Sequence, residues 1–389
     1  MNDCRILYSS SAIYLTFLQF KALIPELMGF THILLNIKEK YSKFFDDKFI
    51  LEKNVTQIFD LYIKLKKEIR LESLNNFRKY KKKIFEYLYK INPNAIISGS
   101  DLSGSDRILF LWCRRNKIPF IIIQPSFISA FPAKYGLVRN FKYIIVNRIF
   151  NLPVYQKQDI FGNESQKSHL FLWGEYFISN PKRKNCYILG NPAFDKLFKS
   201  FSPERKIKNS ILICTDNLPA HIVGEKYLKL VNQTFQKAFG SKPEILFYFK
   251  VHPRESIEKY KKLFPKDKFL NVEIIKDRDI YELINLSDIQ ISVASYTSFE
   301  AAAMGVPIIT IRPDENINVF DQFKREIDIR VNNPDEIVDA INLCLSDKYW
   351  DDFVKKREKY FKSRLYSTDC QSSRRVASTI KKLIRKKCI

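Results

Sequence analysis

The sequence predicts an α/β fold made of two parallel-sheet domains. Apolar runs of strand length alternate with helical segments, most clearly at residues 245–249, 289–293 and 306–311. This alternation is typical of βαβ units, whose strands form a parallel sheet. In the rest of the chain, the same pattern predicts strands at residues 5–8, 32–37, 94–98, 118–124, 169–174, 187–190 and 210–214.

The length of the chain and a polar linker indicate two domains. A chain of 389 residues is long for one domain and sufficient for two. Residues 196–209 are charged and polar and contain a proline, as interdomain linkers often do. We therefore expect an N-terminal domain over residues 1–200 and a C-terminal domain over residues 209–365.

Helical patterns fill the intervals between the expected strands. A long lysine-rich amphipathic stretch covers residues 52–90. Asn333 and Pro334 are typical of a helix start, with asparagine as the cap and proline in the first turn. Further helices are expected at residues 12–23, 107–115, 224–239, 347–364 and 372–387.

The composition is that of a folded, strongly basic protein. Apolar residues make up 46% of the chain, which is enough to bury real cores. Lysine and arginine outnumber the acids 66 to 42, a net charge of +24. Such a charge suits a polyanionic partner, namely nucleic acid, anionic lipid or an acidic glycan. A general excess of lysine on solvated faces explains the charge equally well, and both interpretations remain open.

The cysteines and the N-terminus favour a cytoplasmic protein. The seven cysteines are scattered and form no CxxC pair, so neither a disulfide framework nor a metal site is expected. The first residues lack the basic head and apolar core of a signal peptide. Lys21 and Glu26 interrupt the most apolar N-terminal region too early for a membrane span. If the protein meets a membrane, we expect it to lie on the surface.

Two acids, Asp101 and Asp106, lie at or near the start of the helix that follows the strand at residues 94–98. An acid at this position often caps the helix or interacts with its dipole. The other interpretation is catalytic, because the position lies at the carboxyl end of a parallel sheet, where ligands bind. In that case one of the two acids would deprotonate an acceptor hydroxyl, and Asp101 is the first candidate.

The first motif of the C-terminal half directly follows the strand at residues 245–249. It consists of Lys250, His252, Pro253 and Arg254. The proline fixes the turn, and the imidazole can bind a phosphate by hydrogen bonding or, when protonated, by charge. Lys250 and Arg254 favour the same anionic ligand. A single histidine at a strand end is more often structural, so this hypothesis depends on the second motif.

The second motif follows the strand at residues 289–293 and begins a helix. Its hydroxyl groups belong to Ser295, Thr297 and Ser298, and Glu300 lies one turn further on. Hydroxyls and backbone N–H groups at a helix start can bind phosphate oxygens, and a carboxylate can accept from both ribose hydroxyls. The structural alternative is a serine or threonine cap with a capping acid. Together the two motifs predict a nucleotide phosphate site.

The combined motifs resemble those of nucleotide-sugar glycosyltransferases of the GT-B fold, which has two Rossmann-like domains facing an interdomain cleft. More narrowly, the chain resembles a bacterial surface-polysaccharide group that contains polysialyl- and Kdo-transferases, CDP-glycerol glycerophosphotransferases and non-hydrolysing UDP-N-acetylglucosamine 2-epimerases. The resemblance covers most of residues 95–385 and is dense only over residues 245–313. It is carried by Lys250-Val251-His252-Pro253, Ser295, Ser298, Glu300, Gly305 and Pro307, with Leu172-Trp173-Gly174-Glu175 and Leu189-Gly190-Asn191-Pro192-Ala193-Phe194-Asp195 in the first half.

The resemblance implies roles for these residues. His252, Ser295 and Ser298 would hold the donor phosphate and Glu300 the ribose, with Lys250, Pro253, Arg254 and Thr297 completing the donor-binding set. His252 would also stabilise the departing phosphate, and the base would come from the N-terminal domain. Such enzymes require no metal, because side chains and helix N-termini neutralise the leaving group.

Two departures from the group limit what the resemblance implies. Several relatives carry Gln-His-Gly where this chain has Gln124-Pro125-Ser126, which argues against a catalytic role at that position. The epimerases begin with a Gly-Thr-Arg-Pro-Glu signature that this N-terminus lacks, which argues against epimerisation.

The C-terminal helix allows two interpretations. It has an apolar face formed by Val376, Ile380, Leu383 and Ile384, surrounded by basic side chains. In GT-B proteins a C-terminal helix, here at about residues 366–389, packs back on the first domain. The apolar face would then belong to the core. Alternatively, the basic rim contacts anionic lipid headgroups. The two interpretations are compatible.

The sequence thus predicts a metal-independent glycosyltransferase, inverting by resemblance, at the inner face of the cell membrane. Its co-substrate would be a nucleotide sugar, its acceptor a cell-surface glycan or glycolipid, and it would need no cofactor. The alternatives are a nucleotide-sugar 2-epimerase and a CDP-polyol phosphotransferase. A nucleic-acid-binding protein would explain the charge. However, the chain has no helix-turn-helix, zinc-finger or RNP signature, and we expect no nucleic-acid partner.

Overall fold

The chain divides into two compact units in the computed structural model. Unit 1 comprises residues 1–195 and 364–389, and unit 2 comprises residues 196–363. The structure describes residues 4–9, 19, 22–35, 49–52, 71–99, 104–124, 167–178, 183–205, 207–216, 223–314 and 323–385.

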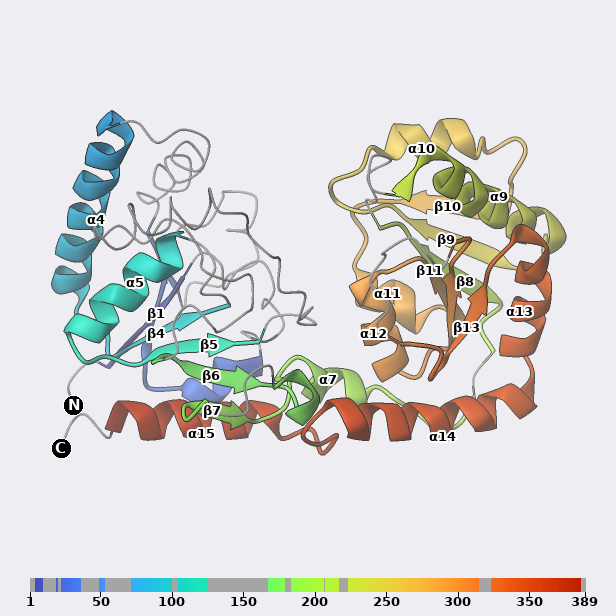
Figure 1. The fold of residues 1–389 in the computed structure, drawn as a ribbon. Coiled ribbons are helices and arrows are strands. Elements are labelled where there is room, and N and C mark those ends of the chain that lie inside the picture. Colours follow the sequence, from blue (N-terminus) through green and yellow to red (C-terminus); the bar gives the residue numbers. More distant parts are fainter. Residues whose placement is uncertain are drawn as a thin grey trace. The chain divides into compact units, whose positions relative to one another are not determined.

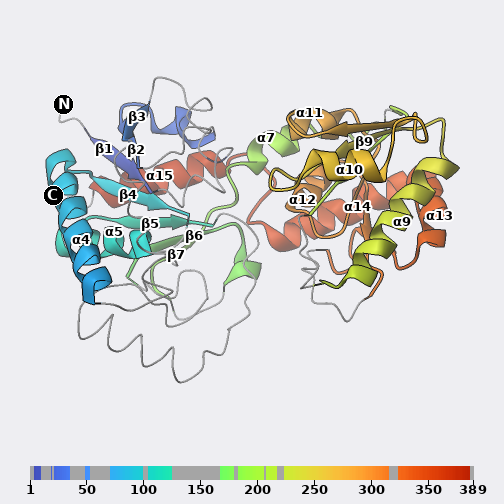
Figure 2. The same cartoon turned by 90° about the horizontal axis from the view of Figure 1, so that it is seen from above.

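Unit 1 is built on a sheet of seven parallel strands in the order β3-β2-β1-β4-β5-β6-β7 (Figures 1 and 2). The order reverses between β1 and β4, which places a topological switch point at the carboxyl ends of these two strands. The strands are β1 (Arg5–Tyr8), β2 (Thr31–Leu35), β3 (Phe49–Glu52), β4 (Ala95–Ser98), β5 (Phe120–Ile123), β6 (His169–Leu172) and β7 (Cys186–Ile188).

Helices cover both faces of this sheet, with α4 and α5 on one face and α15 on the other (Figure 1). The apolar strand residues therefore lie between two layers of helices, as the continuous hydrophobic runs of the sequence require. The helices of unit 1 are η1 (Pro25–Leu27), α4 (Leu71–Ile91), α5 (Gly104–Arg115), η4 (Glu175–Phe177) and α15 (Ser372–Arg385), and α7 (Phe194–Lys199) begins in unit 1 and ends in unit 2.

The C-terminal helix α15 is part of the unit 1 core. Its residues Val376, Ile380 and Ile384 are buried against strand residues of the sheet. The Asp195 carboxylate fixes the start of the helix, because it accepts the N–H groups of Ser372 and Ser373 at 3.0 and 2.7 Å. The apolar face is therefore core, while the basic rim remains at the surface.

A buried amide network holds the carboxyl edge of the unit 1 sheet. Gln124 accepts from the Trp173 backbone N–H through its side chain and from the Trp173 indole through its carbonyl, at 3.0 and 2.8 Å. The Gln19 amide donates to the Gln124 carbonyl and to the Asn191 side chain, both at 3.0 Å. Gln124, the residue of this motif that the chain shares with the resembled group, thus has a structural role.

Unit 2 contains six parallel strands in the order β10-β9-β8-β11-β12-β13. The strands are β8 (Ser210–Cys214), β9 (Leu246–Lys250), β10 (Val272–Ile275), β11 (Ile289–Ser292), β12 (Ile308–Ile311) and β13 (Asp328–Val331). The helices are α9 (Glu225–Ser241), α10 (Ile257–Leu263), α11 (Ile280–Asn285), α12 (Tyr296–Ala303), η5 (Pro334–Glu336), α13 (Ile337–Cys344) and α14 (Asp347–Arg364).

Aromatic residues fill the unit 2 core between α9 and the sheet. The Phe239 ring lies edge-on to Phe247 and Phe264, at centroid distances of 5.0 and 5.2 Å. Phe249 lies 5.1 Å from Phe264 in a similar arrangement. Such pairs add to the stabilisation that the sheet gains from burial of these rings.

The C-terminal end of α12 is held by a glycine turn and a buried arginine. The Val306 N–H bonds the Ala301 carbonyl, and Gly305 has a left-handed φ of +88°, as in a Schellman turn. The Arg357 guanidinium donates to the Ala302 carbonyl at 2.7 Å and lies 3.8 Å from the centre of the Phe201 ring. Burial lowers the pKa of Arg357 to about 10.

Most expected elements agree with the observed ones. The strands at residues 5–8 and 210–214 and the helix at residues 347–364 match those of the structure. Asn333 also caps as expected, because its side chain accepts the Asp335 N–H at 3.0 Å. Residues 12–18, 20–21, 53–70 and 386–387 of the expected helices lie outside the described residues.

Three strands were not anticipated. Residue 52, expected to begin a helix, ends β3, and neither β10 nor β13 was predicted from the sequence. All three are outer strands of their sheets, and each contains an acid that shortens the apolar run. Among the described helices, none combines the length and apolar character needed to cross a membrane.

We expect Gly305→Ala to destabilise unit 2 by about 2–4 kcal/mol, because alanine disfavours the left-handed backbone and strains the packing there. A Cβ at this position would overlap the Phe201 ring. Gly240→Ala in α9 is the matched control, since a Cβ there meets nothing within 4 Å. It should be neutral or stabilising by up to about 1 kcal/mol. Urea unfolding measures both, and equal effects would contradict the prediction.

Candidate functional site

The candidate site lies at the switch point of the unit 2 sheet. Strand β8 has β9 on one side and β11 on the other, so the chain order reverses between β8 and β11. Because all strands are parallel, the segments that follow β8, β9 and β11 emerge at the same edge of the sheet. In open α/β sheets this is the position where ligands bind.

Thr215, the residue after β8, holds the turn that contains His252. Its hydroxyl oxygen accepts the His252 backbone N–H at 2.7 Å and donates to the Glu255 carboxylate at 2.5 Å. The other oxygen of Glu255 accepts from the Tyr260 hydroxyl at 2.7 Å. Thr215 itself is buried. The turn after β9 is therefore fixed to β8 by side-chain hydrogen bonds.

Asp216, the next residue, holds the segment that leads from β11 into α12. One carboxylate oxygen accepts the backbone N–H groups of Val293 and Ala294, at 2.9 and 3.1 Å. The Ser295 side chain hydrogen-bonds the same carboxyl group. The two sequence motifs, in the turn after β9 and the segment after β11, thus lie on either side of Thr215 and Asp216. Neither residue was predicted from the sequence to have a role. The one signal that could have found them was their position directly after a buried strand.

The His252 ring is oriented by its own turn and kept neutral mainly by burial. Its Nδ1 accepts the Arg254 backbone N–H at 3.1 Å, so the ring proton lies on Nε2. Burial lowers the pKa of His252, and the nearby charges of Arg254 and Lys276 lower it further, while Glu255 opposes them. His252 therefore presents a neutral Nε2–H donor at neutral pH. Pro253 and Arg254 are exposed on the same turn.

The start of α12 offers backbone donors more readily than hydroxyls. The Thr297 hydroxyl accepts from the Gln290 amide at 2.7 Å and lies 2.8 Å from the Ser295 hydroxyl. Ser298 is buried, with its hydroxyl 2.7 Å from that of Ser292. The first N–H groups of a helix lack intrahelical partners and can bind an anion. The expected hydroxyl cluster therefore supports the helix start from within the protein.

Lys250 is engaged with the segment after β10. Its ammonium donates to the Lys276 and Arg278 carbonyls, at 2.5 and 2.7 Å, and burial lowers its pKa. The Lys276 ammonium in turn donates to the Glu255 carbonyl at 2.6 Å. These contacts connect the segments after β9 and β10, and direct binding of a ligand by Lys250 stays a prediction.

Glu300 lies inside the protein, one turn into α12. It is 7% exposed, and its carboxylate accepts from the Tyr281 hydroxyl of α11 at 2.7 Å. Burial raises the pKa of Glu300 to about 7, against the opposing effect of the Tyr281 hydrogen bond. Burial likewise raises the pKa of Asp216, to about 6. Both acids are therefore partly protonated close to neutral pH.

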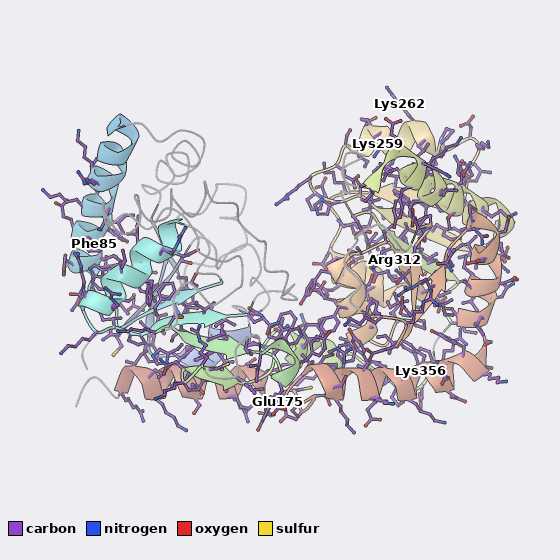
Figure 3. The ribbon with its side chains drawn as sticks, in the orientation of Figure 1. Phe85, Glu175, Lys259, Lys262, Arg312 and Lys356 are labelled. Atoms are coloured by element: carbon purple, nitrogen blue, oxygen red, sulfur yellow. The ribbon has the colours of Figure 1, made fainter. Side chains whose placement is uncertain are left out.

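Arg312 adds a cation to the same edge of the sheet, directly after β12. It is buried, and its position in unit 2 can be seen in Figure 3. Its charge lowers the pKa of the neighbouring Tyr227, but burial outweighs this effect and raises that pKa to about 12. Arg312 was not among the residues predicted from the sequence. In the described part of the chain, no group of three or more His, Cys, Asp or Glu residues is arranged to hold a metal ion.

The two acids considered for catalysis in unit 1 have different outcomes. Asp101 lies outside the described residues. Asp106 is fully buried in the first turn of α5 and accepts from the Ser98 hydroxyl at 3.0 Å. Ser98 accepts in turn from the Ser9 hydroxyl at 2.9 Å, which connects the ends of β1 and β4. Asp106 therefore joins a helix start to two strand ends.

Comparison with solved structures assigns the fold. No protein-family model and no curated protein sequence matches the chain. The UDP-GlcNAc 2-epimerase of Methanocaldococcus jannaschii aligns over 98% of this chain and 99% of its own, with a TM-score of 0.60 and 15% identity. A glycosyltransferase of Rickettsia africae ESF-5 aligns over 99% and 100%, with a TM-score of 0.59 and 14% identity.

A third similar structure is the wall teichoic acid polymerase TagF with CDPG. It aligns over 99% of this chain and 89% of its own, with a TM-score of 0.55 and 12% identity. The chain therefore has a GT-B-like fold, as the sequence predicted. At these identities the similarity establishes the fold, and the chemistry must be argued from the site.

Glu300→Gln should flatten the pH dependence of unit 2 stability. The folded state retains a proton on Glu300 that the unfolded chain releases, so the free energy of unfolding should fall as pH rises from about 4.5 to about 7. The expected fall is roughly 2–4 kcal/mol. Glutamine cannot ionise, so the variant should lack this fall, and any remaining decline up to about pH 6 belongs to Asp216.

Glu282→Gln on α11 is the control for this experiment. Glu282 pairs with Arg278 at 2.6 Å, which lowers its pKa, so its removal should not flatten the decline. Urea unfolding at several pH values measures all three proteins. Parallel profiles for the wild type and Glu300→Gln would show that Glu300 titrates normally.

Proposed function

We propose that unit 2 binds a nucleotide-sugar donor and that the protein is a glycosyltransferase acting on a cell-surface glycan or glycolipid. The supporting observation is the pair Thr215 and Asp216, which fixes the His252 turn and the α12 start on either side of the switch point. The His252 Nε2–H and the α12 N–H groups are then two kinds of donor suited to one phosphate group. The similar folds named for nucleotide-sugar chemistry agree with this proposal.

In the proposed reaction, an acceptor hydroxyl attacks the anomeric carbon of the donor sugar. The bond between this carbon and the phosphate oxygen breaks, and the nucleotide leaves with the electron pair. His252 and the α12 N-terminus stabilise the charge on the leaving phosphate, so a metal is not required. A base from unit 1, with Asp101 as the first candidate, takes the hydroxyl proton. Glu300, buried beside the α12 start, would bind the ribose hydroxyls.

Two other reactions belong to similar folds and can be separated by their products. A 2-epimerase would convert a UDP-sugar without any acceptor, as the name of the Methanocaldococcus protein indicates for that enzyme. A polyol phosphotransferase would move phosphate into the product, and TagF with CDPG has this fold. Incubation of each donor class with and without acceptor, followed by mass analysis of the products, distinguishes the three. For the proposed reaction, free nucleotide should appear only when the acceptor is present, and EDTA should not reduce it.

We expect a nucleotide to raise the melting temperature of the protein in a screen of CMP, CDP, UDP and GDP. His252→Ala should weaken binding of the best nucleotide about tenfold or more, because it removes a hydrogen bond to a charged group. His252→Gln should retain part of the affinity, since its amide N–H can replace the Nε2–H. Isothermal titration measures the dissociation constants.

Lys262→Ala provides the control for these measurements. Lys262 is exposed on α10, and its removal changes the charge of unit 2 without altering the His252 turn (Figure 3). This variant should bind the nucleotide as the wild type does. Unchanged affinity in His252→Ala would remove His252 from the phosphate site.

A further inference from the structure

Helices α4 and α5 of unit 1 carry a dense basic surface. Their rings and cations are in contact, since Tyr89 lies 5.8 Å from Trp112 and the Arg115 guanidinium lies 5.5 Å from the centre of the Phe85 ring. Figures 1 and 2 show the two helices side by side, and Figure 3 marks Phe85 on α4. The exposed cations of this α4–α5 surface are Arg78, Lys79, Lys82, Lys83, Lys90, Arg114, Arg115 and Lys117.

Like charges are crowded on the α4–α5 surface. The pKa of Lys81 is lowered by burial and, in addition, by the charges of Arg115 and Arg78. Among the side chains that the structure describes on these outer faces, the exposed acid is Glu86, which lies 3.8 Å from Lys82. An anionic partner stabilises a surface of this kind, because it reduces the repulsion between the cations.

Another lysine-rich helix shows that this arrangement is not general in the protein. Helix α14 also carries exposed lysines, but it places acids one turn before them. Lys356 pairs with Asp352 and Lys362 with Glu358, both at 2.6 Å. A general excess of lysine on solvated faces would be expected to give such mixed helices. The clustering of like charges on α4 and α5 is therefore not shared by α14.

The basic rim of α15, the other candidate surface, is partly engaged within unit 1. The Lys381 ammonium donates to the Glu26 carbonyl at 2.7 Å, and the Arg374 guanidinium lies 3.6 Å from the Glu26 carboxylate. These contacts hold η1 against the helix. The α4–α5 surface has more exposed cations and is the stronger candidate for an external partner.

We propose that the α4–α5 surface binds the anionic headgroups of a lipid bilayer. The α4 cations run from Arg78 to Lys90, about 18 Å along the helix axis, so they are spread along a line rather than gathered around one phosphate. Tyr89 is 57% exposed among them, and an amphipathic aromatic ring of this kind suits the headgroup region. The proposal depends on the charge of unit 1 and is independent of the donor site in unit 2.

The test is co-sedimentation with vesicles of phosphatidylcholine, with and without phosphatidylglycerol. The wild type should bind the anionic vesicles only, and less as salt increases. A variant with Lys79, Lys82, Lys90 and Arg114 all changed to Gln should bind at least about tenfold more weakly. The matched control changes the same number of exposed cations on α14, namely Lys355, Lys356, Lys359 and Lys362 to Gln. It should bind within about twofold of the wild type.

Three results would overturn the proposal. The first is a wild type that does not bind anionic vesicles. The second is an equal loss in the α4–α5 and α14 variants, or an equal loss when Lys382 and Arg385 of α15 are changed to Gln. The third is release of the protein from the vesicles by mixed-sequence nucleic acid at the same phosphate concentration, which would indicate a nucleic-acid surface. Melting temperatures and nucleotide binding of each variant verify that the fold and the donor site are intact.

Discussion

The candidate site depends on hydrogen bonds from two adjacent side chains to the backbone of two distant turns. Backbone N–H groups near a sheet edge need partners when they are withdrawn from water. Thr215 and Asp216 supply these partners for His252, Val293 and Ala294. Because both residues directly follow β8, the central strand of the site fixes both turns at once. The donors proposed for a phosphate are thus oriented before any ligand arrives, which would avoid the cost of ordering them on binding.

This arrangement places two acids close to a site proposed to bind an anion. An ionised carboxylate would oppose a phosphate, but burial raises the pKa of Asp216 to about 6 and that of Glu300 to about 7. A neighbouring negative charge raises a carboxyl pKa further. Phosphate binding should therefore be accompanied by proton uptake near neutral pH. The neutral His252 ring and the buried Arg312 lie at the same edge of the sheet.

The elements of the site were predictable, but its internal contacts were not. Buried strands such as β8 and β11 are continuous apolar runs, and their order along the chain specifies a parallel sheet. Residues at their carboxyl ends could therefore be proposed as functional. However, a hydrogen bond from Asp216 to Val293 joins residues far apart in the chain and leaves no periodic pattern. The sequence likewise did not show that Ser298 bonds Ser292 inside the protein or that Lys250 supports the segment after β10, because such side-chain contacts leave no periodic pattern.

The meaning of the net charge likewise depends on how the charged residues are arranged in the structure. The sequence has a net charge of +24, which is equally compatible with solvated lysines and with a polyanionic partner. The structure shows which helices pair their lysines with acids and which place cations next to one another. On α14 each of two lysines lies one turn from an acid, so the local field is small. On α4 and α5 the cations lie beside one another and lower the pKa of Lys81. Since electrostatic attraction to a surface depends on local charge density, the α4–α5 surface rather than the total charge determines where an anionic partner would bind.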